Sequence, residues 1–430
     1  MFSMKKWLLG VVLLTVSLAC SFQISPPAPS VAPAGFLTLQ QGRLLLDGKP
    51  YFAVGFNKWD LLQQLLAERF PTNFGEWGVG RRRTAAEQSL QDLKEMGFDI
   101  IRVFGSPFLA SQLTATFFDP AGQTNFLQAN DDMIALARQY DQRIVYTLGW
   151  KLGAFATRRG ETIRQLVLDK NANSRKDFEL FVRTIVTRYK DEPAIALWDI
   201  VNEANLYADV GDAPAAGVVG RIPTFTSREL GTFLSDITAI IKAIDPNHLV
   251  TTGNSRPRDN QFAMNADASD PATLVNGTWR FPSSAWLARD TYEQTAQMLE
   301  LTNPTEVVSI HSYGLPPETR LLADYSRMAA AAGPGDTPKP LFIGEIGPQL
   351  SGTNTLVGYG QPFSRAQVEA QLAEIVTNRI PISLFWAYQV DTSNQSNQRW
   401  DLRRNGRSGA DNEFLRLIKT AQDQLRCNCR

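Results

Sequence analysis

Two glutamates stand at the ends of apolar runs, where the polar tips of buried strands are expected. The run I-A-L-W-D-I-V at 195–201 leads directly into Asn202 and Glu203, and an apolar run of this length is typical of a buried strand. Glu345 holds a comparable position in P-L-F-I-G-E-I-G at 340–347. One carboxylate does not make a mechanism, whereas a pair can divide the work of acid, base and nucleophile.

The elements that must position these glutamates alternate along the chain. Apolar strand candidates from Tyr51 onward are each followed by an amphipathic helix. The strands are expected at 51–57, 98–105, 143–150, 195–203, 248–254, 306–313, 340–347 and 382–389. The helices are expected at 85–96, near 131–140, at 174–189, 227–244 and 291–301, near 319–331, and at 365–378 and 412–425. Gly97 is a typical C-terminal cap for the first helix.

Eight apolar strands separated by helices predict a parallel sheet covered by helices, because parallel strands need crossover connections. At this count, a closed (β/α)8 TIM barrel of the α/β class is the natural arrangement. A doubly wound open sheet would carry a Gly-rich phosphate turn after its first strand, and G-F-N-K-W at 55–59 is not one. Asp47-Gly48 predicts a short N-terminal β-hairpin. The stretch 256–289 is predicted to be a long irregular loop on the carboxyl-terminal face.

The active site of such a barrel lies at the carboxyl ends of its strands. Polar and aromatic residues at these ends therefore make up the candidate site. Beside Asn202, Glu203 and Glu345, they are Asn57, Arg102, Trp150, Asn254, His311, Tyr313 and Trp386. This composition is expected for cleaving a sugar polymer, because two carboxylates do the chemistry and aromatic faces stack on pyranose rings.

Four segments at strand ends carry a resemblance to a known family. W-D-I-V-N-E, I-H-S-Y, I-G-E-I-G and F-W-A-Y, in this order, resemble the retaining (β/α)8 glycoside hydrolases that include cellulases and β-mannanases, family 5 above all. The resemblance covers nearly all of the chain from about Leu37. It implies that Glu203 is the acid/base and that Glu345 is the nucleophile of a double displacement.

The resemblance also implies roles for the neighbours of the two glutamates. Arg102 would support the nucleophile, and Tyr313 would donate a hydrogen bond to it. Asn202 would contact the sugar 2-hydroxyl, and Trp386 would form the floor of the cleaved subsite. His311 matches the polar residue that precedes the tyrosine on the sixth strand.

The end of the third strand departs from the family pattern. Many members carry a His there, whereas this chain reads T-L-G-W and places Trp150 at that position. The tryptophan is closer to the mannanase type, in which Trp150 would be a further wall of the sugar site. Asn57 and Asn254 are substrate-binding candidates because they end the first and fifth strands.

A retaining mechanism sets electrostatic requirements for the two glutamates. Their carboxyl groups must lie roughly 5 to 5.5 Å apart, which the facing fourth and seventh strands of a barrel permit. Arg102 is expected to keep Glu345 ionised, because an opposite charge lowers a carboxyl pKa by about 1 to 3. The charge on Glu345 is expected to raise the pKa of Glu203, which must hold a proton as the general acid.

These residues favour an enzyme, a glycoside hydrolase that cleaves β-linked polysaccharide of the β-1,4-mannan or β-glucan type. Two alternatives stay open on the same barrel: a lipid-anchored carbohydrate-binding protein, and a transglycosylating enzyme that uses a sugar acceptor in place of water. The presence of both carboxylates argues against the first. The sugar, and endo or exo action, depend on loops that the sequence does not place.

The first residues predict an export signal at 1–20. Two lysines precede an apolar stretch at 7–18 that is too short to span a bilayer comfortably. S-L-A-C, which ends at Cys20, resembles a bacterial lipobox with Ser where Leu is usual, so a lipid anchor through Cys20 and simple secretion both stay open. A Pro/Ser/Ala-rich linker is expected at 21–35. We expect residues 36–430 to form a single catalytic domain.

The composition is that of an ordinary globular protein, with 43% hydrophobic and 20% charged residues. Lys+Arg and Asp+Glu balance at 43 each, so nothing predicts nucleic-acid binding. Cys20, Cys427 and Cys429 cannot form a disulfide framework, and two histidines are too few for the usual His-based metal sites. We expect no metal or other cofactor, and a monomer whose partner is a polysaccharide or oligosaccharide.

Overall fold

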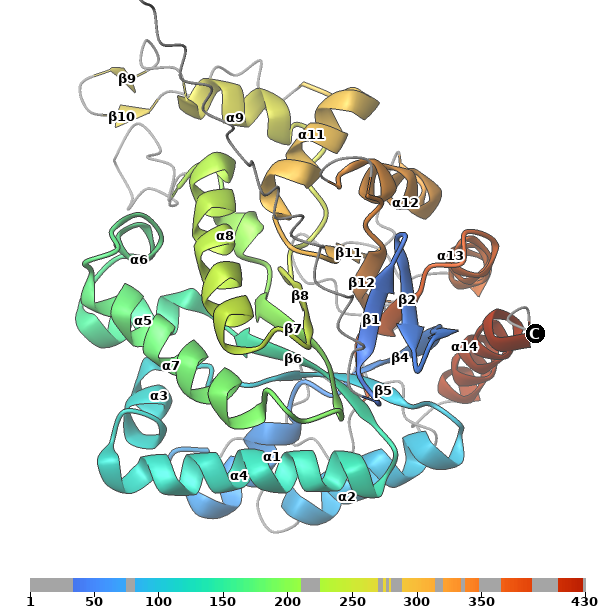
Figure 1. Ribbon diagram of the computed structural model, residues 1–430, viewed down its shortest axis with the longest axis horizontal. Coiled ribbons are helices and arrows are strands. Elements are labelled where there is room, and N and C mark those ends of the chain that lie inside the picture. The colour runs from blue at the N-terminus through green and yellow to red at the C-terminus, as the bar shows by residue number, and fades with distance from the viewer. Residues whose placement is uncertain are drawn as a thin grey trace, which may run out of the picture. The chain divides into compact units, whose positions relative to one another are not determined.

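Eight parallel strands form the central sheet of the computed structural model (Figure 1), in the order β11-β12-β13-β4-β5-β6-β7-β8. Their bounds are β4 Ala53–Asn57, β5 Ile100–Phe104, β6 Arg143–Gly149, β7 Ile195–Val201, β8 Leu249–Thr251, β11 Val308–Ser312, β12 Leu341–Ile346 and β13 Ile382–Phe385. The sheet closes between β8 and β11, where Thr251 forms a parallel bridge with Val307. The Val307 N–H also donates to the Val250 carbonyl at 3.2 Å. The prediction of a (β/α)8 barrel is therefore confirmed.

The structure describes part of the chain in detail. The described ranges are 34–74, 82–209, 225–269, 274–275, 278–279, 288–313, 320–333, 337–347, 365–388 and 409–427. All of them belong to one folded unit, Pro33–Arg430. The predicted signal peptide with Cys20, nearly all of the predicted linker, and Cys429 lie outside these residues. Within the described ranges, no helix combines the length and the apolar character needed to cross a bilayer.

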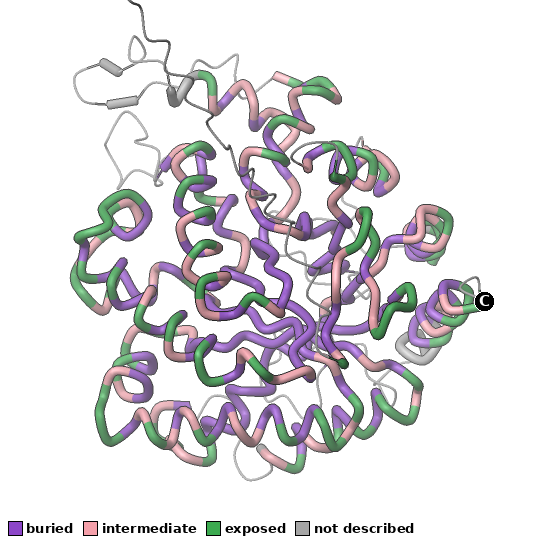
Figure 2. The backbone as a smooth tube through the Cα atoms, in the orientation of Figure 1, coloured by how far each residue is buried: buried purple, intermediate pink, exposed green. Residues whose placement is uncertain are grey.

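Helices surround the strands, with their buried residues turned toward the sheet and their exposed residues turned outward (Figure 2). Their bounds are α1 Leu61–Arg69, α2 Arg82–Glu95, α3 Ala110–Thr116, α4 Pro120–Gln139, α5 Leu152–Arg159, α6 Ile163–Leu168, α7 Asn173–Tyr189, η2 Ala204–Tyr207, α8 Ser227–Ile244, α9 Gln261–Ser269, α11 Tyr292–Thr302, α12 Leu322–Ala331, α13 Arg365–Thr377 and α14 Gly409–Cys427. Gly97 follows α2 with a φ of 80°, in the left-handed region that a C-terminal cap uses. Thr291 caps α11 by accepting a hydrogen bond from the Gln294 N–H.

Two predictions about irregular regions need correction. The stretch 256–289 is not a continuous loop, because it contains α9 and a short antiparallel ribbon of β9 (Leu274–Val275) and β10 (Thr278–Trp279). Among its described side chains, α9 buries only Gln261 and Met264 fully, which leaves too weak an apolar pattern to recognise in sequence. The helices α1, α3, α5 and α6 were also missed, because they lie in connections where only one helix was expected.

The predicted N-terminal hairpin is part of a three-stranded antiparallel sheet. Its strands are β1 Leu37–Gln40, β2 Arg43–Leu46 and β3 Lys49–Pro50. The turn at Asp47-Gly48 has φ of 49° and 75°, as a two-residue hairpin turn requires. Leu37 and Leu44 of this sheet pack in one cluster with Leu197 and Leu249 of the barrel strands. The small sheet therefore covers the end of the barrel opposite the candidate site.

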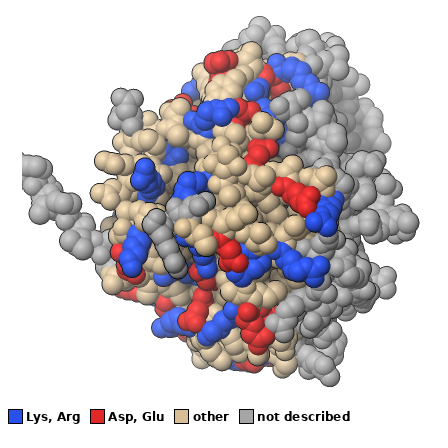
Figure 3. Space-filling view, turned by 90° about the vertical axis from the view of Figure 1, so that its right-hand side faces the viewer, with Lys and Arg blue, Asp and Glu red and all other residues tan. Residues whose placement is uncertain are grey.

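Charged side chains of both signs lie interspersed on the face shown in Figure 3. Pairs such as Arg188 with Asp131 leave 41% of each side chain exposed. Exposed ion pairs contribute only about 0 to 1 kcal/mol each. The buried apolar strands and inner helix faces must therefore supply most of the stability.

A buried charged cluster lies just before β8. The Asp245 carboxylate accepts hydrogen bonds from the His248 ring at 2.5 Å and from the Trp198 indole at 2.7 Å. The other ring nitrogen of His248 faces the Glu192 carbonyl at 3.0 Å, so both ring nitrogens face acceptors. Burial raises the pKa of Asp245, but the hydrogen bond and charge of His248 outweigh burial and hold this pKa below its ordinary value.

Asp245→Asn should destabilise the protein at neutral pH by about 3 to 5 kcal/mol, because it leaves one partner of a buried ion pair uncompensated. A carboxyl whose pKa is lowered by folding adds stability above its unfolded pKa, near 3.9, and loses it as pH falls through the folded value. In urea unfolding, the difference from wild type should be full near pH 7 and shrink below about pH 4. The control Asp423→Asn removes a surface partner of Lys419 and should cost about 1 kcal/mol or less. Equal losses in the two variants would contradict this account.

Candidate active site

One buried guanidinium holds the candidate site together. Arg102 of β5 is fully buried, and its Nε donates to Asp199 Oδ2 at 2.8 Å. Its Nη1 donates to Glu345 Oε1 at 2.9 Å and to Asn57 Oδ1 at 3.2 Å, and its Nη2 donates to Asn202 Oδ1 at 2.9 Å. A buried charge is tolerated only with such partners. Arg102 therefore fixes side chains from β4, β7 and β12 around the barrel mouth.

Asp199 is a residue of this site that the sequence reasoning missed. It lies inside β7, fully buried, and its Oδ2 also accepts a hydrogen bond from Thr147 Oγ1 at 2.7 Å. The signal was a lone carboxylate in the apolar run before Asn202-Glu203. Gly253 makes room for it: a Cβ there would lie 2.2 Å from Asp199 Oδ1, and its φ is 75°.

Glu203 leaves the strand through an unusual backbone conformation. Its φ of 50° and ψ of 34° are left-handed, which is rare for a residue other than glycine. The N–H of Glu203 donates to the Gly253 carbonyl, and the N–H of Asn202 donates to the Gly149 carbonyl, both at 2.9 Å. Neighbouring strands thus hold the Asn202-Glu203 pair at the end of β7, directly before η2.

The two glutamates lie close to each other and differ in exposure. One carboxylate oxygen of each, together with a ring nitrogen of His311, lies within 4.8 Å of the others. The Glu345 side chain is 4% exposed, and the Glu203 side chain is 25% exposed. Tyr313 donates a hydrogen bond from its hydroxyl to Glu345 Oε2. Glu345 is therefore enclosed by donors, whereas Glu203 faces the opening.

His311 bonds to Glu203 through one ring nitrogen only. Its Nδ1 lies 2.9 Å from Glu203 Oε1 and 3.6 Å from Glu345 Oε1. Its Nε2 is buried and has no hydrogen-bond partner among the residues that the structure describes. It lies against Gly344, where a Cβ would approach it to 2.7 Å. A hydrogen on a buried nitrogen with no acceptor is costly, so the geometry favours a hydrogen on Nδ1 that is donated to Glu203.

The pKa directions differ from those predicted. Burial raises the pKa of Glu345, the nearby Glu203 adds to this, and the charges of His311 and Arg102 do not fully offset it. Burial also acts to raise the pKa of Glu203, but the hydrogen bond and charge of His311 bring it below its ordinary value. The sequence could show neither the full burial of Glu345 nor the contact between His311 and Glu203.

An aromatic cluster lies beside the two carboxylates. Trp386 stacks on Trp59 with ring centroids 6.0 Å apart, and Trp59 lies 5.3 Å from Trp150. Phe104 contacts both Trp150 and Trp386, at 4.7 and 6.1 Å. Trp150 and Trp386 are each partly buried, and the Trp386–Ala387 peptide bond is cis. The two predicted sugar platforms thus share one aromatic cluster, through Trp59.

The predicted site residues fall into three groups. Arg102, Asn202, Glu203, His311, Tyr313 and Glu345 converge in one hydrogen-bonded network. Trp150 and Trp386 lie in the adjacent aromatic cluster. Asn57 is fully buried beneath Arg102 and also donates to the Gly344 carbonyl at 2.8 Å. Asn254 is buried as well, and its amide donates to the Thr302 carbonyl at 2.7 Å. The structure therefore places both asparagines inside the protein.

The same network bears on metal binding. Glu203, His311 and Glu345 are residue types that ligate metals, and their ligand atoms lie close enough together to do so. The Arg102 guanidinium is 2.9 Å from Glu345, however, and its positive charge opposes a divalent cation at this point. The arrangement suits proton transfer and nucleophilic attack better than metal binding.

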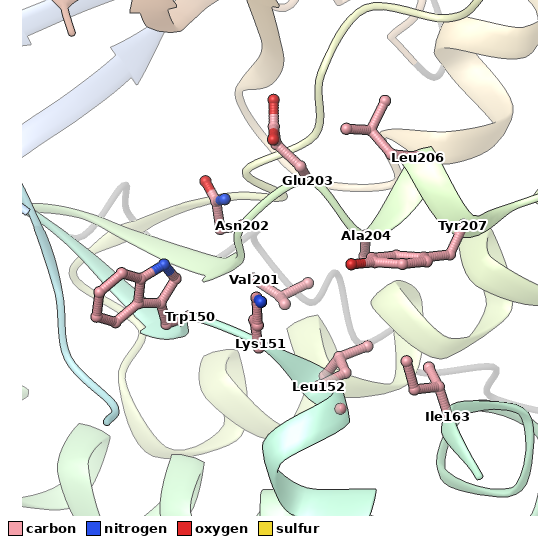
Figure 4. Close-up of a pocket in the computed structure, with 11 residues that line it drawn as sticks. Trp150, Lys151, Leu152, Ile163, Val201, Asn202, Glu203, Ala204, Leu206 and Tyr207 are labelled. Carbon is pink, nitrogen blue, oxygen red and sulfur yellow. The ribbon is translucent and has the colours of Figure 1, made fainter. Parts of the chain in front are cut away.

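A cavity of about 150 Å³ opens on one side of Glu203 (Figure 4). It lies between the residues that follow β6 and those that follow β7. Its lining consists of Trp150, Lys151, Leu152, Gly153, Ile163, Val201, Asn202, Glu203, Ala204, Leu206 and Tyr207. Glu345 is not part of this lining. The cavity therefore adjoins one carboxylate of the pair and not the other.

Comparison with known proteins gives a family match. Residues 63–391 match the model of the cellulase family, glycosyl hydrolase family 5. The chain is 26% identical over 250 residues to a probable mannan endo-1,4-β-mannosidase C of Aspergillus terreus, covering 51% of this chain and 55% of that protein. It is 26% identical over 271 residues to a putative mannan endo-1,4-β-mannosidase 4 of Arabidopsis thaliana, covering 58% of each. The chain thus spans little more than half the length of these relatives.

Solved structures share the fold. An endo-1,4-β-mannanase from Rhizomucor miehei aligns with a TM-score of 0.57 and 18% identity, over 91% of this chain and 99% of that one. A family 5 mannosidase from the same organism aligns with a TM-score of 0.59 and 14% identity, over 92% and 98% of the two chains. At this identity the likeness supports the barrel fold.

Arg102→Met should destabilise the protein, because it removes the cation that Asp199 and Glu345 share and leaves two buried carboxylates without it. Unfolding should cost about 3 to 5 kcal/mol less than in wild type, as measured by urea denaturation. Adding Asp199→Asn to this variant should recover part of the loss, because it removes one unpaired charge. Arg138→Met is the control, since Arg138 pairs with Glu192 at the surface at 3.4 Å. Strictly additive losses in the double variant would contradict the coupling.

Proposed function

The chain belongs to glycosyl hydrolase family 5, and we propose that it is a retaining glycoside hydrolase that cleaves β-1,4-linked mannan. The observation that carries the proposal is the pair of glutamates, whose carboxylate oxygens lie within 4.8 Å of each other. Retaining enzymes hold their carboxyl groups roughly 5 to 5.5 Å apart, whereas inverting enzymes need about 6.5 to 9.5 Å to admit a water molecule. The mannan preference is supported by the names of the relatives.

In the first step, Glu345 attacks the anomeric carbon and Glu203 protonates the oxygen of the leaving group. The burial of Glu345 suits this role, because few groups other than the sugar can reach it. Tyr313 and Arg102 donate hydrogen bonds to the two oxygens of Glu345, and they direct its carboxylate toward the mouth. These donors stabilise the negative charge that Glu345 must carry before it attacks.

In the second step, Glu203 takes a proton from water, which attacks the anomeric carbon and releases Glu345. The more exposed position of Glu203 suits contact with water. Formation of the glycosyl bond neutralises Glu345, which removes one negative charge beside Glu203 and lets it ionise. The same residue thus acts as acid and then as base.

Two further residues support sugar binding in this proposal. Arg102 donates a hydrogen bond to Oδ1 of Asn202, so the amide NH₂ of Asn202 is the group that can donate to a sugar hydroxyl. Trp386 offers a partly buried ring in the aromatic cluster beside the carboxylates. Rings in such positions stack on the apolar faces of sugars.

The enzyme is proposed to act after export. The residues that motivate this, the apolar stretch 7–18 and Cys20, precede the described part of the chain. Secretion and a lipid anchor through Cys20 are both compatible with residues 36–430 as one catalytic domain, and with a monomer.

Glu203→Ala and Glu345→Ala should each lower hydrolysis of β-1,4-mannan by about 100-fold or more, because each removes a group that acts on the reacting atoms. Reducing-sugar release from a panel of mannan, glucan and xylan measures both the activity and the preferred sugar. Proton NMR of the first product should show retained β configuration. Glu87→Ala, at a surface pair with Arg83, is the control. A folded variant at either site with near wild-type activity would contradict the assignment of that glutamate. Chromatography of the products distinguishes hydrolysis from transglycosylation.

His311→Phe should move the alkaline limb of the kcat/KM profile to higher pH. Glu203 must be protonated to act as the acid, so activity falls as pH rises through its pKa. The substitution removes the hydrogen bond and charge that lower this pKa, and burial then raises it. His311→Asn, which keeps a donor, should shift the limb less. An alkaline limb that stays in place in both variants would mean that another group sets it.

A further inference from the structure

The segment 204–209, which follows Glu203, has a left-handed residue at each end. Glu203 precedes it with a φ of 50°, and Asp209 ends it with a φ of 58°. The helix η2 lies between these two residues. Left-handed backbone is unfavourable for residues other than glycine and persists only where surrounding contacts hold it. The contacts of this segment therefore bear on how Glu203 is held.

Asn205 joins η2 to the residues that follow β8. Its Nδ2 donates to the Ser255 carbonyl at 2.8 Å, and its Oδ1 accepts from the Ser255 N–H at 2.9 Å. Asn205 is 5% exposed, so water does not readily replace either bond. Arg258 donates further hydrogen bonds to the carbonyls of Leu206 and Ala208. Side chains thus tie η2 along its length to the segment just beyond β8.

The fully buried carboxylate of Asp209 holds the other end of the segment. Its Oδ1 accepts from the Ser227 N–H at 2.8 Å and from Asn265 Nδ2 at 2.9 Å. Its Oδ2 accepts from Ser227 Oγ at 2.5 Å and from Gln261 Nε2 at 2.6 Å. No ion pair accompanies these donors among the described residues. Because Ser227 begins α8 and the two amides belong to α9, one carboxylate joins the segment to both helices.

We propose that Asn205 and Asp209 are positioning residues for Glu203. They hold the segment 204–209 against the residues that follow β8, so that Glu203 keeps its left-handed backbone and its carboxyl keeps facing the bond to be cleaved. Neither residue lines the cavity beside Glu203, and both act through the backbone of η2 (Figure 4). The inference rests on the proposed function, in which Glu203 protonates the departing oxygen.

The test uses two substrates that differ in their need for an acid. The sugar leaving group of β-1,4-linked mannopentaose must be protonated, whereas 2,4-dinitrophenyl β-mannobioside releases a stable phenolate. Asn205→Ala removes both bonds to Ser255, and Asp209→Asn turns an amide NH₂ toward donors. Each variant should lower kcat/KM for mannopentaose by about 10- to 100-fold, because a misplaced acid loses much of its contribution. For the aryl substrate, kcat/KM should change less than about threefold, because attack by Glu345 is retained.

A second measurement uses azide, which replaces water in the second step and needs no base. Azide bonds to the anomeric carbon as the bond to Glu345 breaks, which gives a β-glycosyl azide and the free carboxylate. With the aryl substrate, azide should raise kcat of both variants and yield this product, while wild-type kcat stays unchanged. Equal losses on both substrates without rescue by azide would show a general structural role and overturn the inference.

Two control variants disturb buried polar groups elsewhere in the barrel. Asp245→Asn matches the Asp209 variant, because Asp245 is a fully buried carboxylate that lies before β8. Asn130→Ala matches the Asn205 variant, because Asn130 is a fully buried amide of α4 that bonds through both of its polar atoms. Both controls should lower the temperature of unfolding and keep the ratio of the two kcat/KM values at the wild-type level.

The outcomes distinguish this inference from the proposed function. A wild-type ratio in folded Asn205→Ala overturns the inference, and this variant decides alone if Asp209→Asn does not fold. A wild-type protein that releases product from neither substrate, nor from any β-linked polysaccharide, overturns the proposed function itself. Thermal unfolding of each variant confirms that folded proteins are being compared.

Discussion

The buried charge of Arg102 is the constraint on which the candidate site depends. A guanidinium removed from water costs several kcal/mol unless fixed acceptors surround it. Here the acceptors come from three other strands: Asn57 at the end of β4, Asp199 in β7 with Asn202 directly after it, and Glu345 in β12. The barrel strands must pair in the right register for these acceptors to reach the three nitrogens of one guanidinium group. Correct folding and correct assembly of the site are therefore the same event at this residue.

Sharing one cation between two carboxylates has an electrostatic consequence. Arg102 pairs with Asp199 as well as Glu345, so its charge is not available to Glu345 alone. Glu345 is also nearly sealed from solvent, and burial favours its neutral form. The pKa of the proposed nucleophile thus reflects two opposing influences: burial raises it, and the nearby cation lowers it. A sugar whose anomeric carbon becomes positive in the transition state would stabilise the ionised form when it is needed.

Local sequence was sufficient for the strands and for most of the site. A polar residue that ends an apolar run is visible without knowing the fold, which is why Glu203, Glu345 and Tyr313 could be predicted to meet. Asp199 could not be assigned, because its meaning depends on Arg102, 97 residues away in the chain. The sequence also could not predict which glutamate has the higher pKa, because this depends on burial and on which carboxylate His311 contacts. Short helices such as α3 and α6 bury too few residues to leave a clear period.

The left-handed conformation of Glu203 ties the proposed acid to its neighbouring cavity. A residue that continued β7 would send the chain on along the strand, whereas a φ of 50° turns it at once into η2. That turn brings Tyr207 to the edge of the cavity that Glu203 lines. This conformation costs on the order of 1 kcal/mol, and the hydrogen bond from the Glu203 N–H to the Gly253 carbonyl helps to offset that cost. Gly253 itself must be glycine, because Asp199 occupies the space of a side chain there. The contact between the end of β7 and Gly253 therefore helps to position Asp199, which pairs with Arg102, and Glu203, which lines the cavity.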